Sequence, residues 1–261
     1  MQFIRIITQE PQHAFFNMAL DEAISETVRQ KLSPPTLRLY QWAGPSVSIG
    51  YFQKISDVNI DYCAEKDYPV VRRMTGGRAI LHDSELTYSL SALKGSLLFR
   101  GSLLESYHVI SKALVSALKL CGADVRVSFS RKKGPVLRSP ACFKSVSYGE
   151  ITLDGRKVVG SAHKRYDNGF MQQGSVMLNF DAGELCAVLN AGSEDDFKEI
   201  GSINTKEGKI SIDALRSSMK EAFEKELNVK LISDNPTKFE HDLAKELETK
   251  KYSTRNWNFA R

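Results

Sequence analysis

The sequence lacks the cysteine pairs and short motifs that mark many metal, redox and nucleotide sites. Its four cysteines are far apart and form no CxxC pair, so neither a zinc site nor a disulfide-exchange site is expected. The patterns GxxxxGK[ST], GxGxxG, HExxH and GxSxG are also missing. These absences exclude a P-loop, a dinucleotide-binding fingerprint, a zincin and a hydrolase nucleophile elbow. We expect reduced thiols and no metal.

Long apolar segments are missing as well. The longest stretch without Asp, Glu, Lys or Arg runs from Leu39 to Gln53, which is shorter than the roughly 20 apolar residues of a membrane-spanning helix. The N-terminal MQFIRIITQEP has an arginine inside its apolar run and no small-residue cleavage site. It predicts a first strand instead of an export signal. We therefore expect a cytoplasmic protein without a membrane partner.

The charge balance is only slightly basic. There are 36 Lys and Arg against 31 Asp and Glu, a net charge of +5, and only Arg131-Lys132-Lys133 is locally dense. No aromatic and basic stacking platform accompanies that run, so we predict no nucleic-acid partner. The excess positive charge suits docking on an acidic protein.

The hydrophobic periodicity predicts an α+β fold in one domain over residues 1–261, because strands dominate early and helices late. No repeat or Pro/Gly-rich linker divides the chain. Asn17 is a candidate N-cap for a first helix. Strands are expected after the N-terminal one at 36–42, 46–52, 86–90, 151–153, 158–159 and 170–178. Further helices are expected at 60–66, 103–120, 182–189, 211–227 and 238–250.

One hairpin can be predicted with its register. Asp154-Gly155 tolerates the positive φ angles of a type I′ turn and lies between two β-rich runs. A two-residue turn there pairs Thr152 with Lys157. Alternation along the strand then places Lys157 and Val159 on the face opposite Val158.

A glycine pair between arginines is the first candidate for chemistry. Residues 72–83 read RRMTGGRAILHD. Gly76 and Gly77 let the backbone approach a ligand and offer N–H donors to an oxyanion or phosphate, and the flanking guanidinium groups supply positive charge. A tight turn between two strands, with the first arginines on a solvated edge, explains the pattern equally well. His82 alone is as consistent with a structural hydrogen bond.

Cys142 and Lys157 are the second candidate. Cys142 lies in a loop before the hairpin, where a buried and inert thiol is the alternative. Lys157 lies in mid-strand, either with its ammonium in water or with the ammonium held in a cleft. The chain between them is long enough to fold back and bring the two together. In that case the ammonium would stabilise a nucleophilic thiolate.

Taken together, these features resemble the catalytic domain shared by lipoate-protein ligases, octanoyltransferases and biotin-protein ligases. Residues 72–89, RRMTGGRAILHDSELTYS, resemble its glycine–arginine signature. A second block, from Pro140 to Phe143 and on through 155–162 and 173–175, resembles bacterial octanoyltransferases that act on octanoyl carrier protein. The resemblance runs from about Leu37 to the final helix. His163 departs from it, because glutamine is expected there.

The resemblance implies a fold and a site. The fold would be a mixed or antiparallel sheet flanked by helices, with an acyltransferase core at about 37–230 and a helical C-terminal end at 231–261. Cys142 would carry the acyl chain and Lys157 would tune the thiol. The substrate-binding residues would be Arg73, Gly76, Gly77, Arg78, His82, Gly160 and Ser161. No cofactor would be needed.

The implied reaction is transfer of an octanoyl group in lipoate assembly. The donor would be octanoyl-acyl carrier protein, and the acceptor a lysine of a lipoyl domain or of the glycine-cleavage H protein. A thioester on Cys142 would be the intermediate. The alternative is a lipoate-protein ligase that uses ATP to form lipoyl-adenylate. Such a ligase has no use for Cys142, so this residue discriminates between the two.

Overall fold

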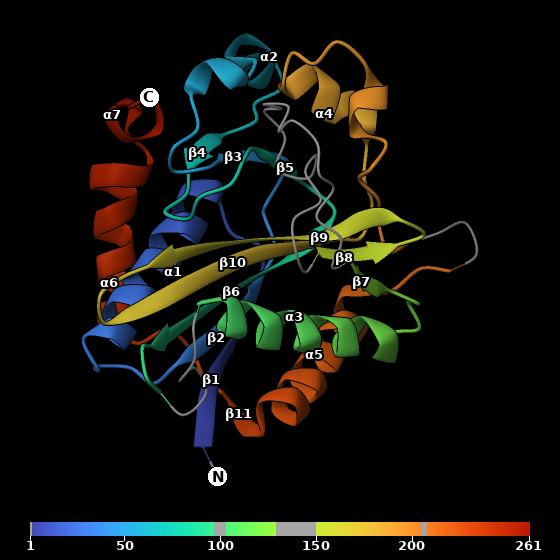
Figure 1. The fold of residues 1–261 in the computed structure, drawn as a ribbon. Coiled ribbons are helices and arrows are strands. Elements are labelled where there is room, and N and C mark those ends of the chain that lie inside the picture. Colours follow the sequence, from blue (N-terminus) through green and yellow to red (C-terminus); the bar gives the residue numbers. More distant parts are fainter. Residues whose placement is uncertain (1, 97–102, 129–149, 205–207) are drawn as a thin grey trace.

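The computed structural model describes residues 2–96, 103–128, 150–204 and 208–261 of the chain. A large mixed sheet forms its centre, and helices cover both faces (Figure 1). A small second sheet lies at one end, together with two short helices. This arrangement confirms the α+β fold and the mixed sheet flanked by helices.

The large sheet has eight strands in the order β11-β1-β2-β6-β10-β9-β8-β7. The contacts of β1 with β11 and β2 are parallel, and the remaining contacts are antiparallel. The strands are β1 (Gln2–Thr8), β2 (Thr36–Tyr40), β6 (Glu85–Leu93), β7 (Arg126–Ser128), β8 (Glu150–Leu153), β9 (Arg156–Arg165), β10 (Gly169–Met177) and β11 (Val229–Ser233). The small sheet has the order β4-β3-β5, from β3 (Ser46–Ile49), β4 (Val70–Arg72) and β5 (Ile80–His82).

The helices form a layer on each face of the large sheet. One core cluster joins α3 (Leu103–Leu120) and α5 (Ile212–Leu227) to the strands. Another joins α1 (Ala14–Arg29) to the C-terminal α6 (Lys238–Leu247). The short helices α2 (Ile60–Glu65) and α4 (Ala182–Val188) pack with the small sheet, and α7 (Arg255–Asn258) lies against β4. Three further single turns span Ile55–Asp57, Glu194–Phe197 and Glu248–Tyr252.

A buried ion pair ties the C-terminal helix to the first strand. The guanidinium of Arg5 on β1 donates to both carboxylate oxygens of Glu240 on α6, at 2.9 and 2.5 Å. Thr27 and Ser33 donate to the same carboxylate. Both charged side chains are buried. Two segments from opposite ends of the chain are thus held together by one carboxylate.

Two predicted local features are wrong in detail. The N-cap of α1 is His13 instead of Asn17, which is buried one turn inside the helix. Asn17 donates to two backbone oxygens outside the helix and accepts from Arg38, so its side chain links neighbouring segments. The strand expected at 46–52 ends at Ile49, where Gly50 meets Gly77.

Other predicted features are confirmed. Helix α3 spans Leu103–Leu120 as expected, and Gly122 after it has φ of 87°. The hairpin turn has positive φ at both Asp154 and Gly155, and Thr152 pairs with Lys157. No helix in the described ranges is long and apolar enough to cross a membrane. The division between a core at 37–230 and an end at 231–261 stays a prediction.

Candidate functional site

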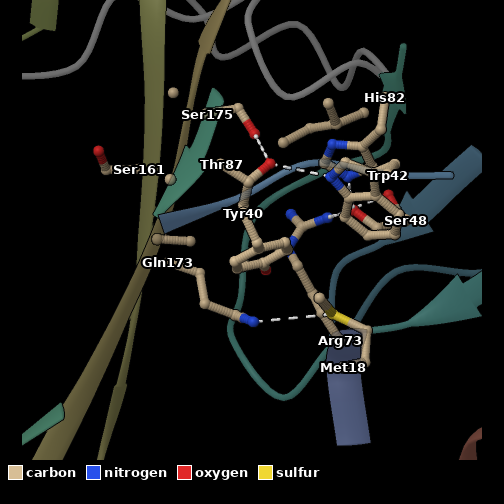
Figure 2. Close-up of a pocket in the computed structure, with 14 residues that line it drawn as sticks. Met18, Tyr40, Trp42, Ser48, Arg73, His82, Thr87, Ser161, Gln173 and Ser175 are labelled. Carbon is tan, nitrogen blue, oxygen red and sulfur yellow. Dashed lines mark hydrogen bonds between the residues drawn. The ribbon is translucent and has the colours of Figure 1, made fainter. Parts of the chain in front are cut away.

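A pocket lies between the large sheet, the small sheet and α1. Its cavity volume is about 20 Å³, which is room for about one water molecule. Figure 2 shows its lining, which draws on both sheets and on one helix. The lining residues are Met18, Tyr40, Trp42, Ser48, Arg73, Ile80, His82, Thr87, Gly160, Ser161, Ala162, Gln173, Gly174 and Ser175.

One wall of the pocket is made by small residues of β9 and β10. Gly160, Ser161 and Ala162 lie opposite Ser175, Gly174 and Gln173, in that order, in the antiparallel ladder. A Cβ on Gly174 would lie 2.5 Å from a ring carbon of Tyr88 and 2.6 Å from the carbonyl oxygen of Gly160. Glycine is therefore required here, because any side chain would push the strands apart.

The opposite wall is a rigid aromatic pair. The Trp42 ring stacks on the His82 ring, with centroids 3.9 Å apart and planes 13° from parallel. Its indole N–H donates to Thr87 Oγ1 at 2.9 Å (Figure 2). Since the indole is held by a hydrogen bond at one edge and by the stacked His82 ring on one face, this wall presents a fixed apolar face to a ligand.

A buried polar network holds His82 from behind. Its Nδ1 lies 2.7 Å from Glu85 Oε1, and its Nε2 lies 2.7 Å from Ser48 Oγ. Burial alone would raise the pKa of the Glu85 carboxyl. The positive charge of His82 and hydrogen bonds from His82, Thr87 and Ser175 outweigh burial, so this pKa is lowered. An ionised Glu85 can only accept, so the His82 Nδ1 carries a proton. Both ring nitrogens are thus engaged within the protein.

Arg73 shapes the glycine loop from inside the pocket. Its guanidinium donates to the carbonyl oxygens of Gly76 and Arg78 at 2.9 and 2.7 Å. It also donates to Ser48 through the backbone oxygen and the hydroxyl, each at 3.0 Å. The side chain is buried, so the solvated edge considered for this arginine is wrong. Arg73 lines the pocket and also fixes the loop beside it.

The loop itself leaves hydrogen-bond donors available. Gly77 has φ of 92°, a conformation that favours glycine. The backbone N–H groups of Gly76, Gly77 and Arg78 donate no hydrogen bond within the described part of the chain. Nη1 of Arg78 is buried and also has no partner there. These three residues adjoin the pocket lining instead of forming it.

A second network underlies the α1 side of the pocket. The buried carboxylate of Asp21 pairs with Arg38 at 2.8 Å and accepts from Tyr40 and Gln173. Gln173 in turn accepts from Thr75. Burial, followed by the charge of Asp21, raises the pKa of Tyr40 well above its usual value. Tyr40 therefore stays protonated and donates.

Sequence reasoning missed several of these lining residues. Tyr40 and Trp42 alternate along one strand and its continuation, a signal shared by ordinary core residues. Ser48 and Met18 carry no local signal at all. His163, the departure from the expected glutamine, does not line the pocket. It packs near Tyr107 and Phe170, and burial lowers its pKa to about 4.

Lys157 is buried beside a carboxylate. A β-bulge leaves Val158 as the extra residue, since Ile151 and Thr152 pair with Val159 and Lys157, and it interrupts the predicted alternation. The Lys157 ammonium lies 2.5 Å from Glu150 Oε1, and only 6% of the residue is exposed. An ammonium in open water is therefore excluded.

The predicted site residues thus fall into three groups. Arg73, His82, Gly160 and Ser161 line one pocket, and the loop of 76–78 adjoins it. Lys157 lies on β9, three residues before Gly160. Cys142 lies outside the described residues, so its contact with Lys157 stays a prediction. Among the described residues, no group of three or more His, Cys, Asp or Glu is placed to hold a metal ion.

The fold and pocket define an α+β protein with an apolar, glycine-walled pocket beside a glycine–arginine loop. The chain is similar to known proteins over most of its length. The octanoyltransferase LipM of Halalkalibacterium halodurans is 33% identical over 276 residues, covering 99% of both chains. That of Moorella thermoacetica is 41% identical over 192 residues, covering 73% of this chain and 70% of the relative. A crystal structure of lipoate-protein ligase A bound with ATP has a TM-score of 0.83 at 26% identity, covering 99% of both chains.

The family described as the lipoyl protein ligase A/B catalytic domain matches residues 13–231. The chain belongs to this family. With the similarity to curated octanoyltransferases over its whole length, this makes it an enzyme, an acyltransferase.

Proposed function

We propose that this enzyme transfers an octanoyl group from octanoyl-acyl carrier protein to a lysine of a lipoyl-accepting domain. The glycine-cleavage H protein is one such acceptor. The pocket is the observation that carries the proposal. Its small-residue wall and fixed aromatic face suit an unbranched acyl chain, which has no polar group to satisfy, and the pocket must widen from about 20 Å³ to take the whole chain. The polar side chains beside it are already hydrogen-bonded to one another.

The loop next to the pocket supports acyl transfer chemistry. A thioester carbonyl becomes an oxyanion when a nucleophile attacks it, and such an oxyanion is stabilised by N–H donors aimed at it. The N–H groups of Gly76 and Gly77 and the buried Nη1 of Arg78 have no partner within the described part of the chain. They are the donors that we assign to this step.

In the first step, the Cys142 thiolate attacks the thioester carbon. A bond from the cysteine sulfur to that carbon forms, the bond to the carrier sulfur breaks, and the carrier leaves as a thiolate that takes up a proton. The charge of Lys157 stabilises the attacking thiolate. The product is an octanoyl-enzyme thioester, and because one thioester replaces another, this step needs no nucleotide.

In the second step, the acceptor lysine attacks the enzyme thioester. The incoming ammonium first loses a proton to a base, since only the amine has a lone pair. The carbon–nitrogen bond forms, the carbon–sulfur bond breaks, and the Cys142 thiolate is released beside Lys157. Conversion of a thioester to an amide runs downhill, which drives the whole transfer. The cytoplasmic location inferred from the sequence stays part of this proposal.

The test is to trap the intermediate. The enzyme is mixed with octanoyl-acyl carrier protein without nucleotide, and its mass is measured before and after adding an acceptor domain. We expect a gain of one octanoyl group on Cys142 that disappears when the acceptor is added. Cys142→Ala should show neither the adduct nor the transfer. Transfer that survives in Cys142→Ala without ATP would refute the proposed thioester.

A lipoate-protein ligase is the second candidate, because the fold matches a ligase that binds ATP. A ligase would form an acyl-adenylate from the free acid and would leave Cys142 unused. Free octanoate or lipoate with ATP and magnesium is the discriminating substrate. Modification of the acceptor under those conditions, with full activity in Cys142→Ala, would favour the ligase.

A further inference from the structure

A basic and aromatic surface lies beside the glycine loop. We define the Tyr51 surface by its five residues, Tyr51, Phe52, Lys54, Lys164 and Arg261. Phe52 is 71% exposed, the highest value among the large apolar side chains that lie on the outside of the described structure. The Lys164 ammonium lies 4.7 Å from the centre of the Tyr51 ring. The Arg261 guanidinium lies 5.1 Å from the Tyr51 ring and 5.0 Å from the Phe52 ring.

The cations of this surface are not engaged in ion pairs within the described part of the chain. Lys54, Lys164 and Arg261 form no ion pair with any residue that the structure describes. Lys251, on the segment before α7, differs because it pairs with Glu22. The Tyr51 surface therefore offers three cations and one exposed aromatic ring to a partner.

The Tyr51 surface is connected directly to the pocket. The backbone N–H of Tyr51 donates to the carbonyl oxygen of Thr75, at 2.9 Å, in the glycine loop. Lys164 follows Ala162 of the pocket wall by two positions on β9, so the two side chains leave the strand on the same side. A partner seated on this surface would sit next to the loop and the small-residue wall.

We infer that the Tyr51 surface is where the acidic acyl carrier protein docks. The inference rests on the proposed function. The donor carries its octanoyl thioester on a flexible arm, so the protein part must sit close to the pocket but outside it. An acidic protein face complements Lys54, Lys164 and Arg261, and opposite charges raise the rate of encounter. Phe52 supplies an exposed apolar contact at the centre of such an interface.

The experiment compares two donors that carry the same octanoyl thioester. One is octanoyl-acyl carrier protein, and the other is octanoyl-pantetheine, which has the arm but no protein. The variant is the double charge reversal Lys164→Glu with Arg261→Glu. The control is Lys230→Glu, an exposed lysine on β11 at the opposite end of the molecule (Figure 1). Release of the donor thiol is measured at low and high salt, and thermal unfolding confirms that each variant is folded.

We expect the double variant to lose about tenfold in kcat/KM with the carrier protein at low salt, and the loss to shrink at high salt. The kcat/KM of the double variant with octanoyl-pantetheine should stay near that of the parent. The kcat/KM of the control should stay near that of the parent with both donors. Phe52→Ser should lower kcat/KM with the carrier protein alone. This pattern would support the docking site.

Four results would overturn the inference. One is an equal loss with both donors, which would mean that the surface acts through the pocket. The second is unchanged activity with the carrier protein, and the third is the same loss in the control. The fourth is a loss confined to transfer from preformed octanoyl-enzyme to the acceptor domain, which would make this the acceptor's surface. Failure of the parent enzyme to react with either octanoyl thioester would instead count against the proposed function.

Discussion

A lysine in the middle of a strand can have its ammonium in water or inside the protein, and Lys157 has the second environment. Its charge is matched by Glu150, the first residue of β8. The hairpin turn made the pairing of Thr152 with Lys157 predictable. The ion pair with Glu150 could not be predicted, because it depends on the bulge at Val158 and on the burial that the full sheet provides.

At this scale we predict that Glu150→Gln destabilises the protein by about 3–5 kcal/mol, since it removes the carboxylate from a buried ammonium. Urea unfolding measures this. Glu150→Asp should lose less because the charge remains. The double variant Glu150→Gln with Lys157→Met should regain much of the loss, because the buried charge is then gone. Equal stability of Glu150→Gln and the parent would contradict the prediction.

Among the elements, the loop between β4 and β5 depends on a residue outside its own sequence. Gly50, just after β3, lies directly against Gly77, and a Cβ there would be 1.9 Å from the Gly77 carbonyl oxygen. The glycine–arginine pattern predicted that the loop matters. It could not reveal that Gly50 is needed for the loop to take its place, because the two segments are brought together by the pairing of β3 with both β4 and β5.

We therefore predict that Gly50→Ala moves the loop and lowers octanoyl transfer by tenfold or more, since misplaced donors no longer meet the oxyanion. Steady-state kinetics with an octanoyl thioester measure the loss. Gly44→Ala is the matched control, because a Cβ on Gly44 meets nothing within 4 Å. If both variants keep similar activity, Gly50 does not support the loop in this way.

On the scale of the whole molecule, the Arg5–Glu240 pair links the two ends of the chain and makes stability depend on pH. Burial would raise the pKa of Glu240. Hydrogen bonds from Arg5, the Thr237 backbone and Thr27 outweigh it and lower the pKa from 4.5 to about 2. A carboxyl whose pKa is lowered in the folded state contributes its full stabilisation at pH values above its unfolded-state pKa. That stability, on the order of 3 kcal/mol, is lost as the pH falls from about 4.5 through 2.

Glu240→Gln should therefore lower the free energy of unfolding by about 3 kcal/mol at neutral pH, because Arg5 stays buried without its carboxylate. It should also flatten the pH dependence between 4.5 and 2. Urea titrations across this range measure both effects. Glu246→Gln, in an exposed pair with Lys250 on the same helix, is the control and should change stability by less than about 0.5 kcal/mol. A parallel pH dependence in Glu240→Gln and the parent would rule out this linkage.

Much of this protein follows from local sequence. The period of α3, the Asp154-Gly155 turn and the register of its hairpin depend on neighbouring residues. The choice of Arg73, Gly160 and Ser161 as site residues came instead from the resemblance to a known family. Tertiary structure alone decided the rest. Gly50 beneath Gly77, Glu150 beside Lys157 and Trp42 stacked on His82 join residues from different segments. Such contacts form only when strands distant in sequence pair, and periodicity records which face of an element is buried but not what it is buried against.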